Sequence, residues 1–257
     1  MLIDSDVHIT PYSEGINTAE LIERMDGNGV DKALAWLQPP YKKSIKTYEK
    51  CNEYVAKAMQ NNPDRVLGFG WIDPHIGIKR SKQLLQKCIE EYEFYGIKLN
   101  GAQNDFFIDD PEMSLPLIKE VSKYQKVLAL HIGADAYDKT HPFRVGKIAD
   151  KFPDLTILIV HMGGVAIPYV TEAAIETAEN HDNLYLIGSE VGSKQIIEAI
   201  EELGPRRVCF GSDTPFEFMD VELARYEVIL DRLNGITEDE KNLIMGENIS
   251  RILGLED

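Results

Sequence analysis

Eight short apolar or β-branched runs alternate with longer amphipathic segments along the whole chain, and this alternation restricts the fold more than any other feature. It is the pattern of repeated strand–helix units around a parallel sheet. Strands are expected at 1–9, 32–37, 66–72, 96–100, 127–132, 156–162, 184–188 and 207–212, and helices at 18–29, 44–62, 79–95 and 111–124. No linker-like or low-complexity stretch divides the 257 residues, and α/β barrels reach this length as one unit. The sequence therefore predicts an α/β fold, a single (β/α)8 TIM barrel domain over residues 1–257.

The last segment, 237–255, has the pattern of a helix start, because Thr237 can act as the cap and acidic residues follow it at once. We predict that this C-terminal helix packs on the barrel and closes it.

The chain is strongly acidic, with a formal charge of -16 and an isoelectric point near 4.8. A field of that sign repels nucleic-acid phosphates and anionic lipid, so neither is an expected partner. No apolar run is long enough to span a bilayer, and the N-terminus lacks the basic region of a signal peptide. Three widely spaced cysteines form no pairing framework, which favours a cytoplasmic protein. The expected partner is a small-molecule substrate.

Polar residues able to bind a metal stand where several predicted strands end, which is where barrel enzymes build their active sites. Asp6 and His8 lie two apart in the first strand, so both side chains point to one face. His131 closes the fifth strand, His161 closes the sixth, and Asp213 follows the eighth.

Each of these residues also has an ordinary structural explanation. A lone histidine at a strand end is usually a satisfied polar residue, and Asp213 alone could cap a following helix. Their coincidence at four strand ends favours a metal, because buried carboxylates and imidazoles without an ion would leave uncompensated charge. Imidazole and carboxylate together suit zinc, and also manganese or iron(II).

Other residues near the predicted strand ends are candidates for substrate contact. Trp71 and Asp73 fall at or beyond the third strand, and Glu190 follows the seventh. Trp71, like Trp36 in the second strand, suits the barrel core equally well.

Six segments, taken in chain order, carry a resemblance to a known family. They are IDSDVHI at 3–9, GIKLN at 96–100, ALHIGA at 129–134, LIVHMGG at 158–164, CFGSDTPF at 209–216 and GENISRILGL at 246–255. They resemble the amidohydrolase superfamily, in particular its amidohydrolase-related branch of metal-dependent barrel hydrolases and non-oxidative decarboxylases. The resemblance covers nearly the whole chain.

The resemblance implies that Asp6, His8, His131 and Asp213 hold one divalent metal ion, with zinc as the first expectation. It implies that His161 stands beside the metal as an acid/base or substrate-polarising group. The superfamily usually opens with His-x-His, whereas this chain has Asp6-x-His8, so the expected site is more acidic than the usual pattern.

Lys98 ends the fourth strand, the position of a carboxylated lysine that bridges two metals in binuclear members of the superfamily. The other interpretation is an ammonium group that binds a substrate carboxylate or a neighbouring acid. We favour the second interpretation, and with it a single metal.

Hydrolysis of a small carbonyl compound, such as an amide or lactone, is the first functional expectation. A metal-bound water would be the nucleophile, Asp213 would accept its proton, and His161 would stabilise the oxyanion or protonate the leaving group. The alternatives are non-oxidative decarboxylation of an unsaturated or aromatic acid and a catalytically silent metal-binding barrel. No motif decides between them, and self-association is compatible with the sequence.

Overall fold

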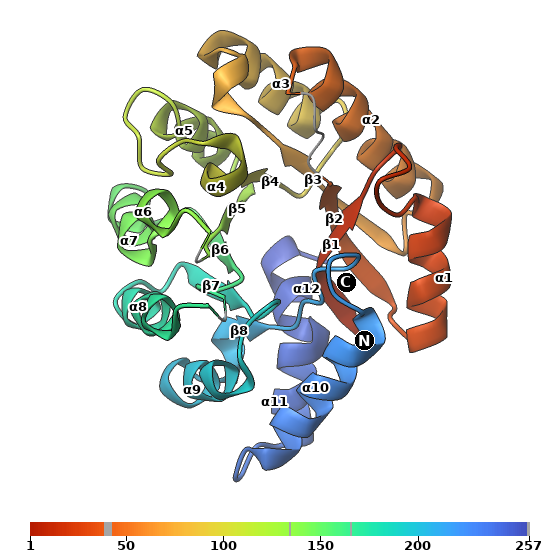
Figure 1. Ribbon diagram of the computed structural model, residues 1–257, viewed down its shortest axis with the longest axis vertical. Helices are drawn as coiled ribbons and strands as arrows, with labels where there is room; N and C mark the ends of the chain where they lie inside the picture. The colour runs from red at the N-terminus through yellow and green to blue at the C-terminus, as the bar shows by residue number, and fades with distance from the viewer. Residues whose placement is uncertain (39–42, 134, 165, 256–257) are drawn as a thin grey trace.

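A barrel of eight parallel strands forms the centre of the computed structural model, which describes residues 1–38, 43–133, 135–164 and 166–255 (Figure 1). The strands are β1 (Ile3–Ile9), β2 (Lys32–Leu37), β3 (Val66–Trp71), β4 (Gly96–Leu99), β5 (Val127–His131), β6 (Ile157–Val160), β7 (Leu184–Ile187) and β8 (Val208–Cys209). Each strand pairs in parallel with the next in the sequence. The predicted (β/α)8 barrel is confirmed.

Backbone hydrogen bonds between β1 and the segment after β8 close the barrel. They run from Ser5 N to the Phe210 carbonyl (3.1 Å), from Asp213 N to the Asp6 carbonyl (2.8 Å) and from His8 N to the Thr214 carbonyl (2.7 Å). Asp6 and Asp213 are thereby brought together by the backbone itself.

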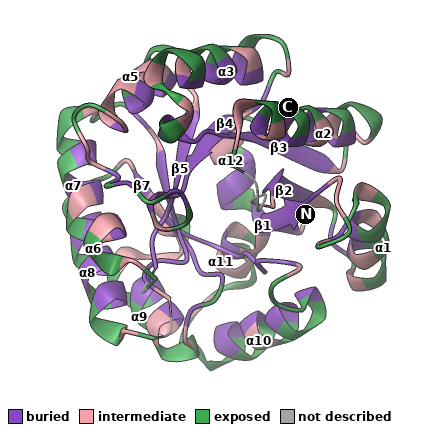
Figure 2. Cartoon of the chain, turned by 45° about the horizontal axis from the view of Figure 1, so that its top comes forward, coloured by how far each residue is buried: buried purple, intermediate pink, exposed green. Residues whose placement is uncertain are grey.

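Helices surround the barrel and connect its strands, with their exposed faces outward (Figure 2). They are α1 (Thr18–Asn28), α2 (Ile45–Asn61), α3 (Ile78–Glu90), α4 (Gly101–Asn104), α5 (Leu115–Lys123), α6 (Tyr137–Thr140), α7 (Pro142–Lys151), α8 (Pro168–Glu179), α9 (Ser193–Leu203), α10 (Met219–Arg232), α11 (Glu238–Asn242) and α12 (Asn248–Leu253), with 3-10 turns at Pro74–Ile76 and Pro205–Arg207. Across the described ranges, none of the helices has the length and apolar character that a membrane crossing requires.

Strand alternation separates the core into a barrel interior and a layer between strands and helices. Leu34, Phe69 and Leu158 belong to the interior cluster, whereas their strand neighbours pack toward the helices. In β1 the register against β2 shifts between Asp4 and Val7. This bulge inserts one extra residue and so changes which later residues of β1 face inward.

The C-terminal tail closes the amino end of the barrel, as predicted, but not as one continuous helix. A π-helical segment, Leu243–Glu247, separates α11 from α12. The Ile244 carbonyl accepts a hydrogen bond from Phe210 N (2.9 Å), and a Cβ at Gly246 would lie 2.3 Å from the Met1 carbonyl oxygen. The helix is therefore broken where it pairs with the barrel wall, and Ile249 fills the interior cluster.

Candidate functional site

A cavity of about 440 Å³ opens at the carboxyl ends of the strands. Most of its lining residues have polar or charged side chains, although their carbon atoms also form part of the wall. The lining residues include His8, Asn100, Gln103, His131, Asp135, His161, Glu190, Asp213, Phe216, Glu217, Glu222 and Arg225. Five of the predicted site residues, His8, His131, His161, Glu190 and Asp213, therefore line one cavity.

Two carboxylates and one imidazole form the centre of the site. His8 Nε2 lies 3.3 Å from Asp213 Oδ1 and 3.7 Å from Asp6 Oδ1. Both of those carboxylate oxygens are buried and have no hydrogen-bond partner among the described residues. Buried oxygens of this kind are costly unless a cation or a donor meets them.

The orientation of His8 is fixed by its other ring nitrogen. Nδ1 lies 3.1 Å from the Leu37 carbonyl, which can only accept, so Nδ1 carries the proton and Nε2 has the lone pair. The indole N–H of Trp36 donates to Nε2 at 3.0 Å. Burial, with the nearby Lys98 charge, lowers the pKa of His8 to about 3, so the ring is neutral at pH 7.

Lys98 extends from β4 into the barrel interior and is fully buried. Its Nζ lies 3.7 Å from Asp6 Oδ1 and 3.6 Å from the centroid of the Trp36 ring, without a hydrogen bond. Burial lowers the Lys98 pKa, and the Asp6 charge opposes that shift. Lys98 does not line the cavity, so in this structure it contacts Asp6 from below the pocket floor.

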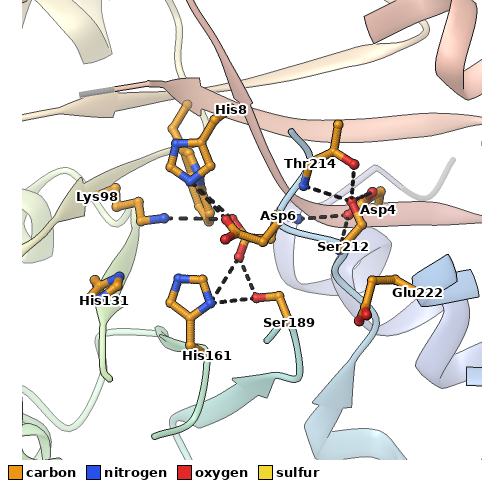
Figure 3. Close-up of polar contacts among 12 residues, drawn as sticks. Asp4, Asp6, His8, Lys98, His131, His161, Ser189, Ser212, Thr214 and Glu222 are labelled. Carbon is orange, nitrogen blue, oxygen red and sulfur yellow. Dashed lines mark hydrogen bonds and ion pairs between the residues drawn. The ribbon is translucent and has the colours of Figure 1, made fainter. Parts of the chain in front are cut away.

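The remaining two imidazoles stand side by side, with ring centroids 4.7 Å apart. His161 Nδ1 lies 3.0 Å from Ser189 Oγ and 3.6 Å from Asp6 Oδ2 (Figure 3). His131 Nε2 instead lies 2.9 Å from Asp135 Oδ1. Burial and the neighbouring His131 lower the pKa of His161 well below 6.5.

Three pocket residues have left-handed backbone conformations, which are unusual for residues other than glycine. His161 has φ 67°, Glu190 has φ 52° and Asp213 has φ 59°. They follow β6, β7 and β8, so each strand ends in a sharp turn at the rim of the cavity. Strained backbone of this kind concentrates at functional sites.

The carboxyl groups of the cavity raise one another's pKa. Burial and then the Asp6 charge raise the pKa of Asp213 to about 9. Burial and then the Asp213 charge raise the pKa of Glu190 to about 7. At pH 7 Asp213 therefore holds its proton, and a positive charge beside these carboxyl groups would favour their ionised forms.

The donor set fits a divalent metal ion. Ligand atoms of Asp6, His161 and Asp213 lie within 4.8 Å of one another, and His8 Nε2 approaches both carboxylates. Carboxylate and imidazole ligands suit zinc and manganese. His131 is outside this compact group, since its ring nitrogen is paired with Asp135.

Two predicted substrate contacts, Trp71 and Asp73, do not line the cavity. The Trp71 indole N–H donates to Asn104 Oδ1 at 3.0 Å. Asp73 Oδ2 accepts hydrogen bonds from Tyr48 Oη (2.9 Å) and Asn104 Nδ2 (3.0 Å). Both side chains are buried in a polar network beside β3.

Several residues of the site were not singled out from the sequence. Ser189 lies between Asp6 and His161, and Asp135 pairs with His131. Ser189 directly follows the predicted seventh strand, so the strand-end rule that selected Glu190 also applies to it. Asn100 caps α4 and Gln103 lies in it, Phe216 and Glu217 belong to the loop after β8, and Glu222 and Arg225 lie in the first half of α10.

A family model described as Amidohydrolase matches residues 3–255. A γ-resorcylate decarboxylase from a Polaromonas species is 24% identical over 261 residues, covering 77% of both chains. Two solved structures have the same fold. A 2,6-dihydroxybenzoate decarboxylase in complex with 2,6-dihydroxybenzoate has TM-score 0.80 and 20% identity, covering 100% of this chain and 99% of that one. A dihydroxybenzoic acid decarboxylase from Polaromonas, with bound manganese and 2-nitroresorcinol, has TM-score 0.76 and 20% identity, covering 99% and 97%.

These comparisons correct the functional expectation of a hydrolase. The relatives are decarboxylases, which agrees with the alternative and not with the first expectation. The physical reason is that the strand-end carboxylates and imidazoles provide a metal site in either reaction. Nothing in those residues records whether water or the substrate itself is activated.

Proposed function

The chain belongs to the amidohydrolase family, and from this premise we propose that it catalyses the metal-dependent, non-oxidative decarboxylation of a hydroxybenzoic acid. The observation that carries the proposal is the similarity, over most of both chains, to a decarboxylase of γ-resorcylate. The cavity supports it, because its polar floor carries a metal-competent donor set and its rim carries an aromatic side chain.

We propose that one divalent ion binds at the floor of the cavity. Asp6, His8, His131 and Asp213 would hold it, and the two orphaned carboxylate oxygens are the contacts that it would complete. His131 would exchange its partner Asp135 for the ion, and His8 Nε2 would exchange the Trp36 N–H. Manganese, present in the Polaromonas structure, and zinc, expected from the ligand types, are the ions to compare.

A bound ion would supply Lewis acidity and a positive focus for an anionic substrate in an acidic protein. In the reaction, the bond between the ring carbon and the carboxylate breaks, CO2 leaves, and the ring carbon takes up one proton. His161 and Asp213 both line the cavity and are the groups able to hold that proton. Lys98, below the floor, offsets part of the Asp6 charge.

The cavity walls suit a hydroxylated aromatic ring. Phe216, 49% exposed, presents an apolar face at the rim, and its ring lies 5.2 Å from that of His8. Glu190 and Glu217 line the same cavity and can accept hydrogen bonds from phenolic hydroxyl groups. A ring with hydroxyl groups beside its carboxylate can use both features.

The test is CO2 release from 2,6-dihydroxybenzoate and other mono- and dihydroxybenzoates by protein loaded with manganese or zinc. We expect metal-dependent CO2 release matched by the decarboxylated phenol, and none after chelation. Metal binding without CO2 release from any hydroxybenzoate would contradict the proposal and favour a silent metal-binding barrel. An amide and lactone panel serves as the control for residual hydrolysis.

Elemental analysis of the same preparations tests the single-ion proposal. One equivalent of metal is expected, with Lys98 as an ammonium or amine group. Two equivalents would contradict it and indicate that Lys98 bridges two ions.

A further inference from the structure

We propose that Ser189 is a positioning residue that holds the proton of His161 on Nδ1 and leaves Nε2 as the nitrogen that exchanges protons with the substrate. The proton assignment stands on the geometry of three side chains. Its catalytic consequence rests on the proposed decarboxylation.

The assignment follows from counting protons. Ser189 Oγ lies 2.5 Å from Asp6 Oδ2 and 3.0 Å from His161 Nδ1 (Figure 3). A hydroxyl group has one proton to donate, and the Ser189 hydroxyl directs it at Asp6 Oδ2. Ser189 therefore donates to Asp6 and accepts from His161, so Nδ1 carries a proton. This holds for a neutral and for a protonated imidazole alike.

This assignment excludes Nδ1 of His161 as a metal-binding atom. The ring nitrogen that approaches Asp6 is Nδ1, at 3.6 Å, and a protonated nitrogen cannot coordinate a cation. Nδ1 is therefore not the atom through which His161 could join the compact group of Asp6 and Asp213. Its Nε2 points away from Ser189, and the residue lines the cavity (Figure 3).

The backbone around Ser189 is held firmly. Gly188 N donates to the Cys209 carbonyl at 3.1 Å, and a Cβ at Gly188 would lie 2.1 Å from Tyr226 Oη, so only glycine fits there. Glu190 then turns the chain with φ 52°. Ser189 itself is fully buried, so solvent does not compete for its hydroxyl group. A third group that fixes the tautomer of a catalytic imidazole is a recurring arrangement in enzymes.

The direct test is the protonation state of the His161 ring nitrogens. Long-range 1H–15N correlation spectra of the 15N-labelled, zinc-loaded protein distinguish the two tautomers, and the His161→Gln variant assigns the signals. We expect protonated Nδ1 in the wild type and in Ser189→Thr, which keeps the hydroxyl. In Ser189→Ala the 3.6 Å gap to Asp6 is too long for a hydrogen bond, so we expect a shift toward the other tautomer.

Ser5→Ala is the matched control, because Ser5 is also a buried serine but its Oγ has no hydrogen-bond partner among the described residues. Its His161 signals should match those of the wild type. In turnover, Ser189→Ala should lower kcat by about 10- to 100-fold with little change in KM, and Ser189→Thr should recover most of the loss.

An unprotonated Nδ1 in the wild type, or an unchanged His161 spectrum in Ser189→Ala, would overturn the assignment. A kcat in Ser189→Ala equal to that of Ser5→Ala would overturn its catalytic consequence. The spectra do not depend on turnover, so the absence of decarboxylation would contradict the proposed function and leave the proton assignment to be decided by the spectra.

Discussion

The strand β1 carries two fully buried carboxylates on its two sides, and the protein satisfies only one of them. On the outer side, Asp4 Oδ1 accepts from the backbone N–H groups of Ser212 (2.9 Å) and Asp6 (3.1 Å), and Asp4 Oδ2 accepts from Ser212 Oγ (2.5 Å). On the inner side, Asp6 Oδ2 accepts from Ser189, while Asp6 Oδ1 has no hydrogen bond from a described residue and lies 3.7 Å from both Lys98 Nζ and His8 Nε2 (Figure 3). Asp4 and Asp6 are equally buried, so the two carboxylates differ only in how many hydrogen-bond donors they meet.

This difference separates a structural carboxylate from a functional one. Asp4 is bonded to the backbone at positions 6 and 212, so it holds β1 against the segment that carries Asp213. Burial raises the pKa of Asp4 to about 7, and its hydrogen bonds oppose that shift. Asp6 Oδ1 lies beside His8 and Lys98 without a hydrogen bond from a described residue, so it is available to bind a metal ion.

The largest expected effect comes from the inner carboxylate. Asp6→Asn removes a proposed metal ligand, and the charge stabilisation by a metal is worth several kcal/mol, so kcat/KM should fall by about 10³-fold or more. The metal content, measured by elemental analysis, should fall as well. The thermal stability of the metal-free variant reflects two opposing changes: a buried carboxylate with an unsatisfied oxygen is removed, and the buried Lys98 amine loses its ion-pair partner.

Asp4→Asn is the matched control for this change, because it removes the same charge from the other side of the same strand. It should keep its metal. Comparable metal loss in both variants would mean that the two sides of β1 are not functionally distinct.

The second effect is on stability and comes from the outer carboxylate. Asp4→Ala leaves two buried N–H groups without their acceptor, and the Ser212 hydroxyl keeps only Thr214 Oγ1 at 2.9 Å. At about 1–3 kcal/mol for each unsatisfied group, partly relieved by relaxation, we expect a loss of about 3 kcal/mol in the free energy of unfolding. Urea denaturation of the metal-free protein measures it. Asp6→Ala should be measured in the same way. A smaller loss of stability in Asp4→Ala than in Asp6→Ala would mean that Asp6, and not Asp4, is the structural carboxylate.

Most of the fold could be predicted from the sequence, because hydrophobic periodicity records which segments face a core. The strand ends were less accurate. The sixth strand was expected to reach residue 162, but it ends at Val160, since His161 and Met162 have positive φ values that no apolar pattern encodes. The third predicted helix was expected to reach residue 95, but α3 ends at Glu90, and Phe94 packs against β3 instead.

The site was predictable only where the chemistry resides in the residue type. Carboxylates and imidazoles at strand ends stand out, and the structure brings Asp6, His8 and Asp213 together. The partners of such groups do not stand out. Trp71 bonds to Asn104, a residue 33 positions away, and an isolated serine such as Ser189 has no distinctive pattern. Contacts between distant segments decide which polar residues are already satisfied.

A smaller effect tests the bridge between Asp4 and the Asp213 segment. Ser212→Ala removes the hydroxyl that donates to Asp4 Oδ2 and accepts from Thr214 N at 3.1 Å. We expect a loss of about 1–2 kcal/mol, less than in Asp4→Ala, because the backbone bond from Ser212 N to Asp4 remains. The two losses should not be additive in the double variant, since both changes break the same network. Full additivity would show that Asp4 and Ser212 act separately.

The smallest effect concerns Glu190. Its pKa is raised by burial and by the charges of Asp213 and Asp6, so its titration reports on the inner side of β1. Its carboxyl group loses its proton near pH 4.5 in the unfolded chain and near pH 7 in the folded protein. Between these values the folded state holds more protons, so raising the pH across this window favours unfolding. Glu190→Gln removes this contribution, so the variant should become more stable than the wild type as the pH rises from 4.5 to 7, and should stay so above it.

Because Glu190 is exposed to the open cavity, the gain should be at most about 1 kcal/mol. Thermal melts of wild type and Glu190→Gln at pH 4.5, 6 and 8 measure it, with the exposed Glu198→Gln on α9 as the control. A saturating divalent ion should shrink the gain, because its charge offsets those of Asp6 and Asp213 that help to raise the Glu190 pKa. A gain that is unchanged by the metal would mean that the ion does not bind between these two carboxylates. Metal binding would then no longer distinguish Asp6, on the inner side of β1, from Asp4 on the outer side.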